Sequence, residues 1–204
     1  MKAAQNSPSS AAHSPMKPGY KQTEVGVIPE DWEVYSLSSF GEMLSSKRIF
    51  EDDYVKSGVP FYRGKEISLL IENKPLDDEY FISEERFNAI RGAFGAPREG
   101  DILITAVGTL GNIYLIPDDQ PFYFKDGNVI WLRSVSGINN SYLAAQLRKQ
   151  KQIILDNAIG STQKALTIVV LKQTPIPLPP TKAEQAAITE ALSDADALIE
   201  SLEQ

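Results

Sequence analysis

The chain has 204 residues, of which 42% are hydrophobic and 23% charged, a balance typical of a folded globular protein. It contains no cysteine, and its one histidine, His13, lies in a Ser- and Ala-rich stretch. Disulfides, thiolate chemistry, Cys- or His-ligated metals and serine–histidine catalysis are therefore disfavoured. The net charge of −7 argues against a protein that coats nucleic acid or anionic membranes by bulk charge, although it leaves room for a local basic patch.

The N-terminal part of the chain is predicted to contain a tail followed by short strands. Residues 1–18 are Ser, Ala, Pro and Asn without periodicity, so we expect a disordered tail and a folded part that begins near Tyr20. Trp32, Val34 and Leu37 follow a polar turn at 29–31 and predict a short first strand. Residues 59–64 predict a second extended segment that ends at glycine.

The middle of the chain carries the strongest strand signal. Residues 83–90 predict a short helix with Ser83 as its N-cap, followed by a Gly- and Pro-rich loop. Residues 101–107 form the clearest hydrophobic β pattern, and Gly108-Thr109-Leu110-Gly111 closes it. Further strands are expected at residues 112–116, 121–124 and 128–132.

The segment before the C-terminus is predicted to be helical and then extended. Residues 141–159 carry an apolar stripe at helical spacing, and Gly160 follows as a stop. Residues 166–171 are rich in β-branched side chains and are ambiguous between strand and helix. Residues 174–180 must be extended because of their closely spaced prolines.

A last helix is predicted from Thr181, where Thr181 and Glu184 fit a capping box. Apolar residues follow at spacings of four, three, four and three, which is typical of a coiled-coil seam: Ile188, Leu192, Ala195, Ile199 and Leu202. This helix carries one lysine against six acidic residues, so it supplies most of the net charge. The pattern is still running at Gln204, from which we expect a cut chain or a longer helix in a parent protein.

No constellation of catalytic or cofactor-binding residues is evident. The chain has no phosphate-binding P-loop and no dinucleotide fingerprint, and the strand expected after Gly108–Gly111 offers no helix dipole to a phosphate. The acidic runs at 51–53 and 77–79 are more typical of solvated loops than of Mg²⁺ sites. We therefore predict no catalytic residue, no metal and no cofactor.

Basic residues cluster in predicted loops beside Gly, Ser and Thr: Lys47-Arg48, Arg63 and Lys65, Arg86, Arg91 and Arg98, and Lys164. Arginines and hydroxyls on a rigid β scaffold suit base edges and phosphates. Composition alone, however, favours ordinary solubilising charges.

Longer motifs are more specific in combination. They are GVIPEDWEV at 26–34, PFYRGKEI at 60–67, GDILIT at 100–105 with GTLG at 108–111, GSTQKAL at 160–166, LKQTPIPLPP at 171–180 and EQAAI at 184–188. Their order resembles that of type I restriction–modification specificity subunits, over about residues 20–204.

The resemblance implies an α+β fold: one target recognition domain at 19–180, with a small mixed β-sheet and flanking helices, then a spacer helix at 181–204. Such subunits carry two recognition domains, each reading half of a split target, joined by helices of an antiparallel coiled coil. With one domain present, the chain is expected to be a half-subunit, a truncated product or a fragment. The resemblance also implies a short helix at residues 166–171.

The resemblance further implies a non-catalytic protein. Because no apolar run approaches about 20 residues and the N-terminus lacks the pattern of a secretory signal, we expect it to be cytoplasmic and not membrane-bound. Its expected partners are double-stranded DNA, methyltransferase subunits, which hold S-adenosylmethionine, and restriction subunits. The expected DNA-contact residues are Arg63, Lys65, Thr105, Thr109, Thr162, Gln163 and Lys164. Glutamine suits adenine, and lysine suits guanine or phosphate. The seam of the last helix is expected to pair with a second spacer helix or, in a two-fold homodimer, with another copy.

Two alternatives stay open from the sequence. The chain could be the recognition module of a fused restriction–methyltransferase enzyme, which would bind S-adenosylmethionine itself. It could instead be an interaction module whose acidic helix binds a protein partner and whose domain ignores DNA. The DNA target cannot be read from the residues.

Overall fold

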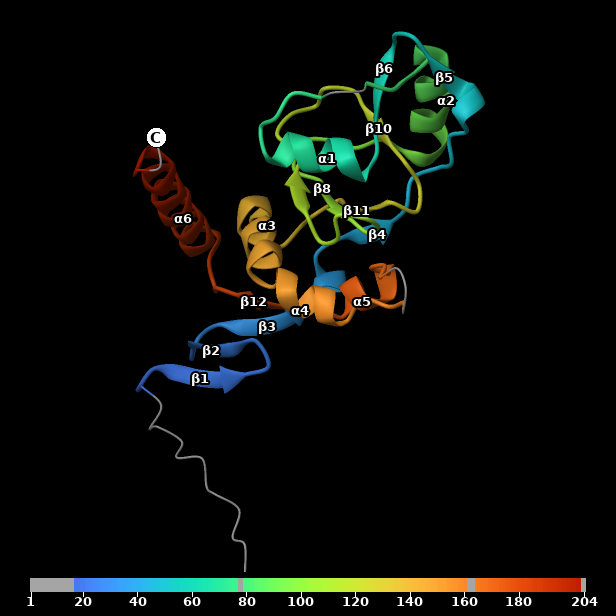
Figure 1. Cartoon of the computed structure of the whole chain (residues 1–204). Helices are drawn as coiled ribbons and strands as arrows, with labels where there is room; N and C mark the ends of the chain where they lie inside the picture. The colour runs from blue at the N-terminus through green and yellow to red at the C-terminus, as the bar shows by residue number, and fades with distance from the viewer. Residues whose placement is uncertain (1–16, 77–78, 161–163, 203–204) are drawn as a thin grey trace, which may run out of the picture.

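The computed structural model describes residues 17–76, 79–160 and 164–202, and within them the chain folds into short strands in four small sheets with flanking helices (Figure 1). The strands are β1 (Tyr20–Thr23), β2 (Gly26–Pro29), β3 (Glu33–Ser36), β4 (Glu42–Leu44), β5 (Tyr54–Val55), β6 (Val59–Tyr62), β7 (Phe81–Ile82), β8 (Ile102–Thr105), β9 (Ile113–Leu115), β10 (Tyr123–Phe124), β11 (Val129–Arg133) and β12 (Pro175–Leu178). The helices are α1 (Gly64–Ile71), α2 (Glu84–Phe94), α3 (Asn140–Lys149), α4 (Lys151–Asp156), α5 (Ile168–Lys172) and α6 (Lys182–Leu202), with 3₁₀ turns at Leu37–Ser39 and Glu51–Asp53. The predicted α+β class is confirmed.

The central sheet has the order β4-β11-β8-β9 and is antiparallel throughout. Strand β8 is fully buried: Ile102 and Ile104 face a core that includes α3, whereas Leu103 faces a second core around α1 and Trp131. Burial on both faces explains why this strand reads as a continuous hydrophobic run.

A second sheet, of order β10-β6-β7-β5, packs against α2. Strands β6 and β10 pair in parallel and the other pairs are antiparallel, so this sheet is mixed. Helix α2 begins after Ser83, whose hydroxyl accepts a hydrogen bond from the Arg86 amide at 3.1 Å, as predicted. It extends to Phe94, further than expected, and ends at Gly95 with φ of 85°.

Other helical predictions are corrected in part. Gly64 does not end a segment but begins α1, which the sequence pattern did not reveal. The helix expected at 141–159 is broken at Gln150 into α3 and α4 and ends at Asp156. The ambiguous segment at 166–171 contains the short helix α5, as the resemblance implied.

The proline-rich segment pairs as strand β12 with β3, below the helices in Figure 1. Prolines at 175, 177 and 179 share one edge of this extended segment, where they offer no N–H donor. Their carbonyls accept hydrogen bonds from Gln150 Nε2 at 2.7 Å, Tyr142 Oη at 2.8 Å and Gln185 Nε2 at 3.2 Å, respectively. Side chains of α3 and α6 thus cover the edge.

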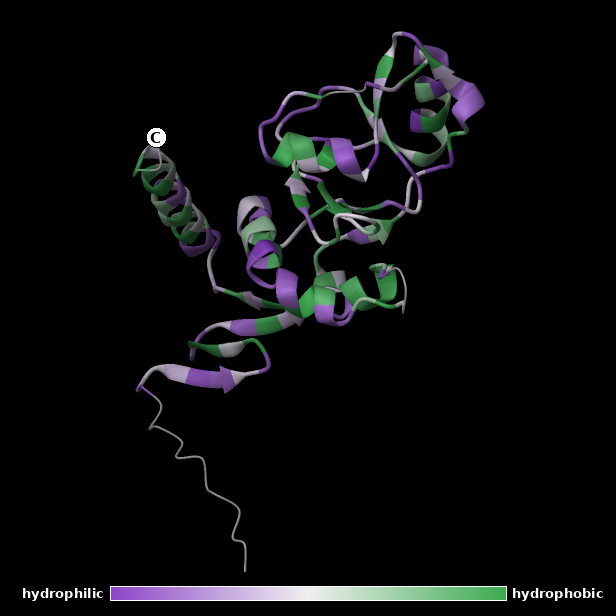
Figure 2. Ribbon diagram, in the orientation of Figure 1, coloured by the Kyte–Doolittle hydropathy of each residue, from purple (hydrophilic) through white to green (hydrophobic). Residues whose placement is uncertain are grey.

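Helix α6 lies beside α3 at its start and then stands away from the other elements (Figure 1). Thr181 caps it, accepting the Glu184 amide at 3.1 Å. Hydrophobic and hydrophilic residues alternate along its length (Figure 2). Among the described helices, none has both the length and the apolar character needed to cross a bilayer.

Candidate functional site

The loop after β8 lies against the first turns of α1. The Thr109 and Ser68 hydroxyls are 2.8 Å apart, and a Cβ placed on Gly64 would lie 3.5 Å from the Val107 carbonyl oxygen. A surface cavity between the two elements is lined by Arg63, Gly64, Lys65, Ser68, Leu69, Glu72, Val107, Gly108, Thr109 and Asn128. Three of the predicted contact residues, on two elements far apart in sequence, therefore border one cavity.

A chain of hydrogen bonds fixes this loop. Ser68 donates its only proton to the Gly64 carbonyl at 2.8 Å, and it accepts from Asn112 Nδ2 at 2.9 Å. Thr109, an exposed residue, must then be the donor to Ser68, so its hydroxyl has only lone pairs left to offer a ligand. Lys151 Nζ donates to Asn112 Oδ1 at 2.6 Å and ties α4 to the same network.

Thr105 has a different environment from the one that the sequence predicted. Its exposed fraction is 0%, its hydroxyl donates to the Thr109 carbonyl, and it accepts from the Asn112 amide at 2.9 Å. Both capacities of the hydroxyl are thus used inside the domain. Thr105 supports the loop from below and cannot reach a ligand outside it.

The loop that carries the predicted contacts Thr162, Gln163 and Lys164 starts beside the loop at 107–111. Ile159 and Ala165 form an isolated antiparallel bridge, with N–O distances of 3.0 and 2.8 Å. The next amide, of Leu166, donates to the Ala106 carbonyl at 3.0 Å, so the base of this loop is attached to the end of β8. Lys164 is exposed, whereas Thr162 and Gln163 lie outside the described residues.

Arg63 is held by an ion pair. Its Nε and Nη2 donate to the two carboxylate oxygens of Glu66, at 3.0 and 2.6 Å, and its guanidinium lies 4.2 Å from the centre of the Tyr80 ring. Glu66 is only 2% exposed. Burial by itself would raise the pKa of Glu66, but hydrogen bonds from the Arg63 side chain and amide outweigh it and lower that pKa. The hydrogen bonds that Arg63 donates to the Glu66 carboxylate raise the pKa of Arg63 in turn.

Sequence reasoning missed the supporting residues Ser68, Asn112 and Lys151. Ser68 lies on a helix that was not predicted, and the partners of Asn112 are 39 and 44 positions away in the chain. Lys65 was predicted; it is exposed in the first turn of α1, on the rim of the cavity.

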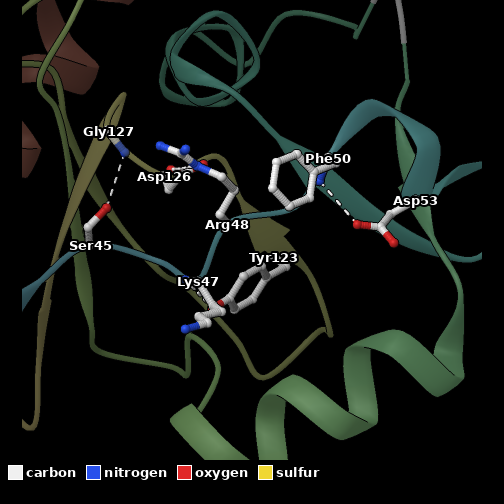
Figure 3. A network of polar contacts seen from close by, with 8 residues as sticks. All are labelled: Ser45, Lys47, Arg48, Phe50, Asp53, Tyr123, Asp126 and Gly127. Atoms are coloured by element: carbon white, nitrogen blue, oxygen red, sulfur yellow. Dashed lines mark hydrogen bonds and ion pairs between the residues drawn. The ribbon is translucent and has the colours of Figure 1, made fainter.

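Other basic loop residues lie elsewhere. Lys47 and Arg48 belong to an irregular segment that is attached to β10 and to the turn after it (Figure 3). The Lys47 amide donates to Tyr123 Oη at 2.8 Å, and Arg48 pairs with Asp126 at the same distance. Arg86 faces Asp53 at 3.7 Å. These cations serve contacts within the domain.

The acidic run at 51–53 is described by the structure, whereas that at 77–79 is described only at Glu79. Within the residues that the structure describes, no group of three or more His, Asp and Glu side chains could hold an ion. Asp53 accepts the Phe50 amide at 3.1 Å, and Asp77 and Asp78 lie outside the described residues.

The predicted seam of α6 has one part packed against the domain and one part exposed to solvent. Ile188 is half-buried and packs against the main core. The seam residues beyond it are exposed: Leu192, Ala195, Ile199 and Leu202. Leu198 is also exposed, so the outer half of α6 presents apolar surface.

Comparisons with known proteins agree on one family. The family model described as "Type I restriction modification DNA specificity domain" matches residues 29–204. A Haemophilus influenzae protein, named as a candidate type I restriction enzyme specificity subunit, is 32% identical over 181 residues, which cover 86% of this chain and 43% of that protein. The MjaVIII type I restriction enzyme specificity subunit of Methanocaldococcus jannaschii is 28% identical, with 89% and 43% covered. The chain spans less than half the length of these relatives.

Solved structures show the same fold. The HsdS subunit from Thermoanaerobacter tengcongensis superposes with a TM-score of 0.65 at 18% identity, covering 91% of this chain and 42% of that one. The S subunit of the type I restriction–modification system from M. genitalium gives a TM-score of 0.58 at 20% identity, with 92% and 44% covered.

Proposed function

Because the chain belongs to the family of type I restriction–modification DNA specificity domains, we propose that it is a non-catalytic specificity module that reads one half of a split DNA target. Residues 19–180 would form the recognition domain and residues 181–204 a spacer helix. Methyltransferase and restriction subunits would be its protein partners and would carry out catalysis.

The observation that carries this proposal is the convergence of three polar loops. The first two turns of α1, the loop at 107–111 and the base of the loop at 159–165 are joined by direct hydrogen bonds and contacts around the end of β8. Loops held on a rigid scaffold are well suited to base-edge and phosphate contacts, because little order is lost on binding.

The proposed contacts divide by chemistry. Lys65 and Lys164 are exposed cations that suit phosphates or the acceptor edge of guanine. The remaining lone pairs of the Thr109 hydroxyl suit an amino group of adenine or cytosine, and a phosphate has no donor to offer them. Thr162 and Gln163 remain proposed base contacts. Arg63 remains a proposed contact, although its Nε and Nη2 already donate to Glu66. Thr105 is buried, and we assign it a supporting role.

Charge distribution is compatible with this proposal. Residues 181–204 carry six acidic residues and one lysine and so account for five of the seven net negative charges, and α6 stands away from the three loops. The recognition domain itself is therefore near balance, so bulk attraction to DNA is weak. Specific contacts, together with partner subunits, must supply the affinity.

Selection from a pool of random duplexes, followed by sequencing of the bound fraction, tests the proposal. We expect enrichment of a short motif whose recovery falls as salt increases. A chain that enriches no motif, alone or with its methyltransferase subunits, would contradict a specificity role and favour the protein-interaction alternative. Binding of S-adenosylmethionine by the chain alone would favour the fused-enzyme alternative.

A further inference from the structure

Specific polar contacts hold the first turn of helix α6 to the domain. They are made by Glu184 and Gln185, which together are called the root of α6. Gln185 is only 2% exposed. Its Oε1 accepts the Asn139 amide at 2.7 Å, and its Nε2 donates to the Pro179 carbonyl at 3.2 Å. Asn139 is itself the N-cap of α3, where its side chain accepts the Tyr142 amide at 3.0 Å. The side-chain amide of Gln185 therefore connects the first turn of α6 to the start of α3 and to the segment before α6.

The neighbouring residue makes a second contact in another direction. The indole Nε1 of Trp32 donates to Glu184 Oε1 at 3.0 Å. The Trp32 ring meets Tyr142 edge-on, with 6.4 Å between centroids, and Tyr142 is fully buried. The predicted capping box is thus only half present: Thr181 accepts the Glu184 amide, but the Glu184 carboxylate is used by Trp32.

Adjacent residues on a helix point about 100° apart. Contacts at both Glu184 and Gln185 therefore resist rotation of α6 about its axis as well as tilting. Beyond these two residues, Ile188 packs against the main core and Asp196 attracts Arg148 of α3, whereas the described side chains from Glu190 to Ile199 are all exposed.

The outer part of α6 acts as a lever on this root. From Gln185 to Leu202 the helix axis is about 26 Å long, at 1.5 Å per residue. A tilt of about 10° at the root would move the far end by about 4.5 Å, which exceeds the rise of one base pair, about 3.4 Å. A small change in the angle between α6 and the domain would thus change the distance spanned by the helix by a whole base pair.

We propose that Gln185 and the Trp32–Glu184 hydrogen bond are positioning elements that set the angle of α6, and through it the spacing between the two half-targets that a two-domain assembly reads. The spacing part rests on the proposed function. The angle itself is a property of the DNA-free chain and can be measured independently.

Site-directed spin labelling measures the angle directly, because the chain has no cysteine to remove. Labels at Asn88→Cys on α2 and Ser193→Cys on α6, both exposed positions, report the distance between domain and helix. Labelled chain diluted in unlabelled chain excludes distances between copies. We expect a narrow distribution in the parent, and a shifted or at least two-fold broader one in Gln185→Leu and in Glu184→Ala.

Matched controls separate positioning from folding. Gln173→Leu makes the same change at an exposed position beside α5 and should leave the distribution unchanged. Trp32→Phe keeps a ring but loses the indole donor, and should broaden the distribution even if Gln185→Leu does not fold. Unaltered distributions in folded Glu184→Ala and Trp32→Phe chains would overturn the proposal.

The spacing is tested with assembled, two-domain complexes on duplexes whose half-targets are separated by spacers that differ by one base pair. We expect Glu184→Ala to flatten the spacing preference at least three-fold without changing the half-target motif. An altered label distance with an unaltered spacing preference would overturn the link to spacing. A parent complex that binds no duplex would refute the proposed function and leave the distance result standing.

Discussion

Burial decides which polar side chains near the three loops can face a ligand. Residue type and loop position placed Arg63, Thr105 and Thr109 together as contacts, yet Thr105 is fully buried, Arg63 is partly buried and paired with Glu66, and only Thr109 among them is an exposed residue. The sequence shows that Thr105 ends a strand, but not that a loop folds over it. The path of the loop must be known before a residue that contacts a ligand can be told apart from one that only supports the loop.

Lys164 provides a test at a single residue. Lys164→Ala should weaken binding of all duplexes to a similar extent and lower the salt dependence of binding by about one phosphate contact, if the ammonium meets the backbone. Titration of a labelled duplex at several salt concentrations measures both quantities. Lys172→Ala removes an equally exposed charge on α5 and serves as the control. Equal effects of the two substitutions would contradict the assignment.

Arg63 is expected to matter for folding as well as for DNA. Arg63→Ala leaves the buried Glu66 carboxylate without its main partner, which should cost about 1–3 kcal/mol of unfolding free energy. The Arg63 side chain is 30% exposed, so solvent limits the loss. Chemical denaturation measures the effect, and Glu66→Gln in the same chain should recover part of it.

The same pair predicts a pH dependence. The pKa of Glu66 is lowered in the folded chain, so its stabilising contribution is present above the unfolded pKa, about 4.3, and is lost as pH falls through the folded value. The stability difference between the parent and Arg63→Ala should therefore shrink on acidification below about pH 4. A difference that stays constant between pH 7 and pH 3 would show that Glu66 is not its source.

At the scale of elements, hydrophobic patterns predicted the buried strands well and the contact-dependent elements poorly. Strands β8 and β11 are apolar runs whose burial needs no knowledge of partners. The hairpin β1–β2 was missed because YKQT carries little apolar signal, and α1 was missed because Gly64 reads as a stop. The parallel pairing of β6 with β10 joins segments about 60 residues apart and has no local signature.

The loop at 107–111 should lose order when its support is removed. Ser68→Ala deletes the acceptor of Thr109 and Asn112, so the loop amides should exchange with solvent faster and duplex affinity should fall several-fold. Hydrogen exchange measures the first effect and duplex titration the second. Ser57→Ala, at an exposed bend, is the control. Faster exchange without loss of affinity would place the loop outside the DNA interface.

At the scale of the whole molecule, the exposed seam of α6 should mediate association. Two copies, or α6 and a second spacer helix, would bury the apolar residues that this chain leaves in water. We expect concentration-dependent dimers in sedimentation, abolished by Leu192→Glu with Ile199→Glu. Ser193→Glu adds charge beside the seam and should have a much smaller effect. A parent chain that stays monomeric at millimolar concentration would contradict pairing between copies.

The covered edge of β12 has a consequence for how copies can meet. An open strand edge commonly recruits a strand from another molecule and so seeds aggregation. Here the prolines remove the donors from that edge, and Gln150, Tyr142 and Gln185 occupy its acceptors. The amide of Gln150 shows what this arrangement costs, since its buried Oε1 finds no donor among the described residues. Strand exchange at the β12 edge is thereby disfavoured next to the first turn of α6, whereas the exposed apolar side chains of α6 favour helix pairing.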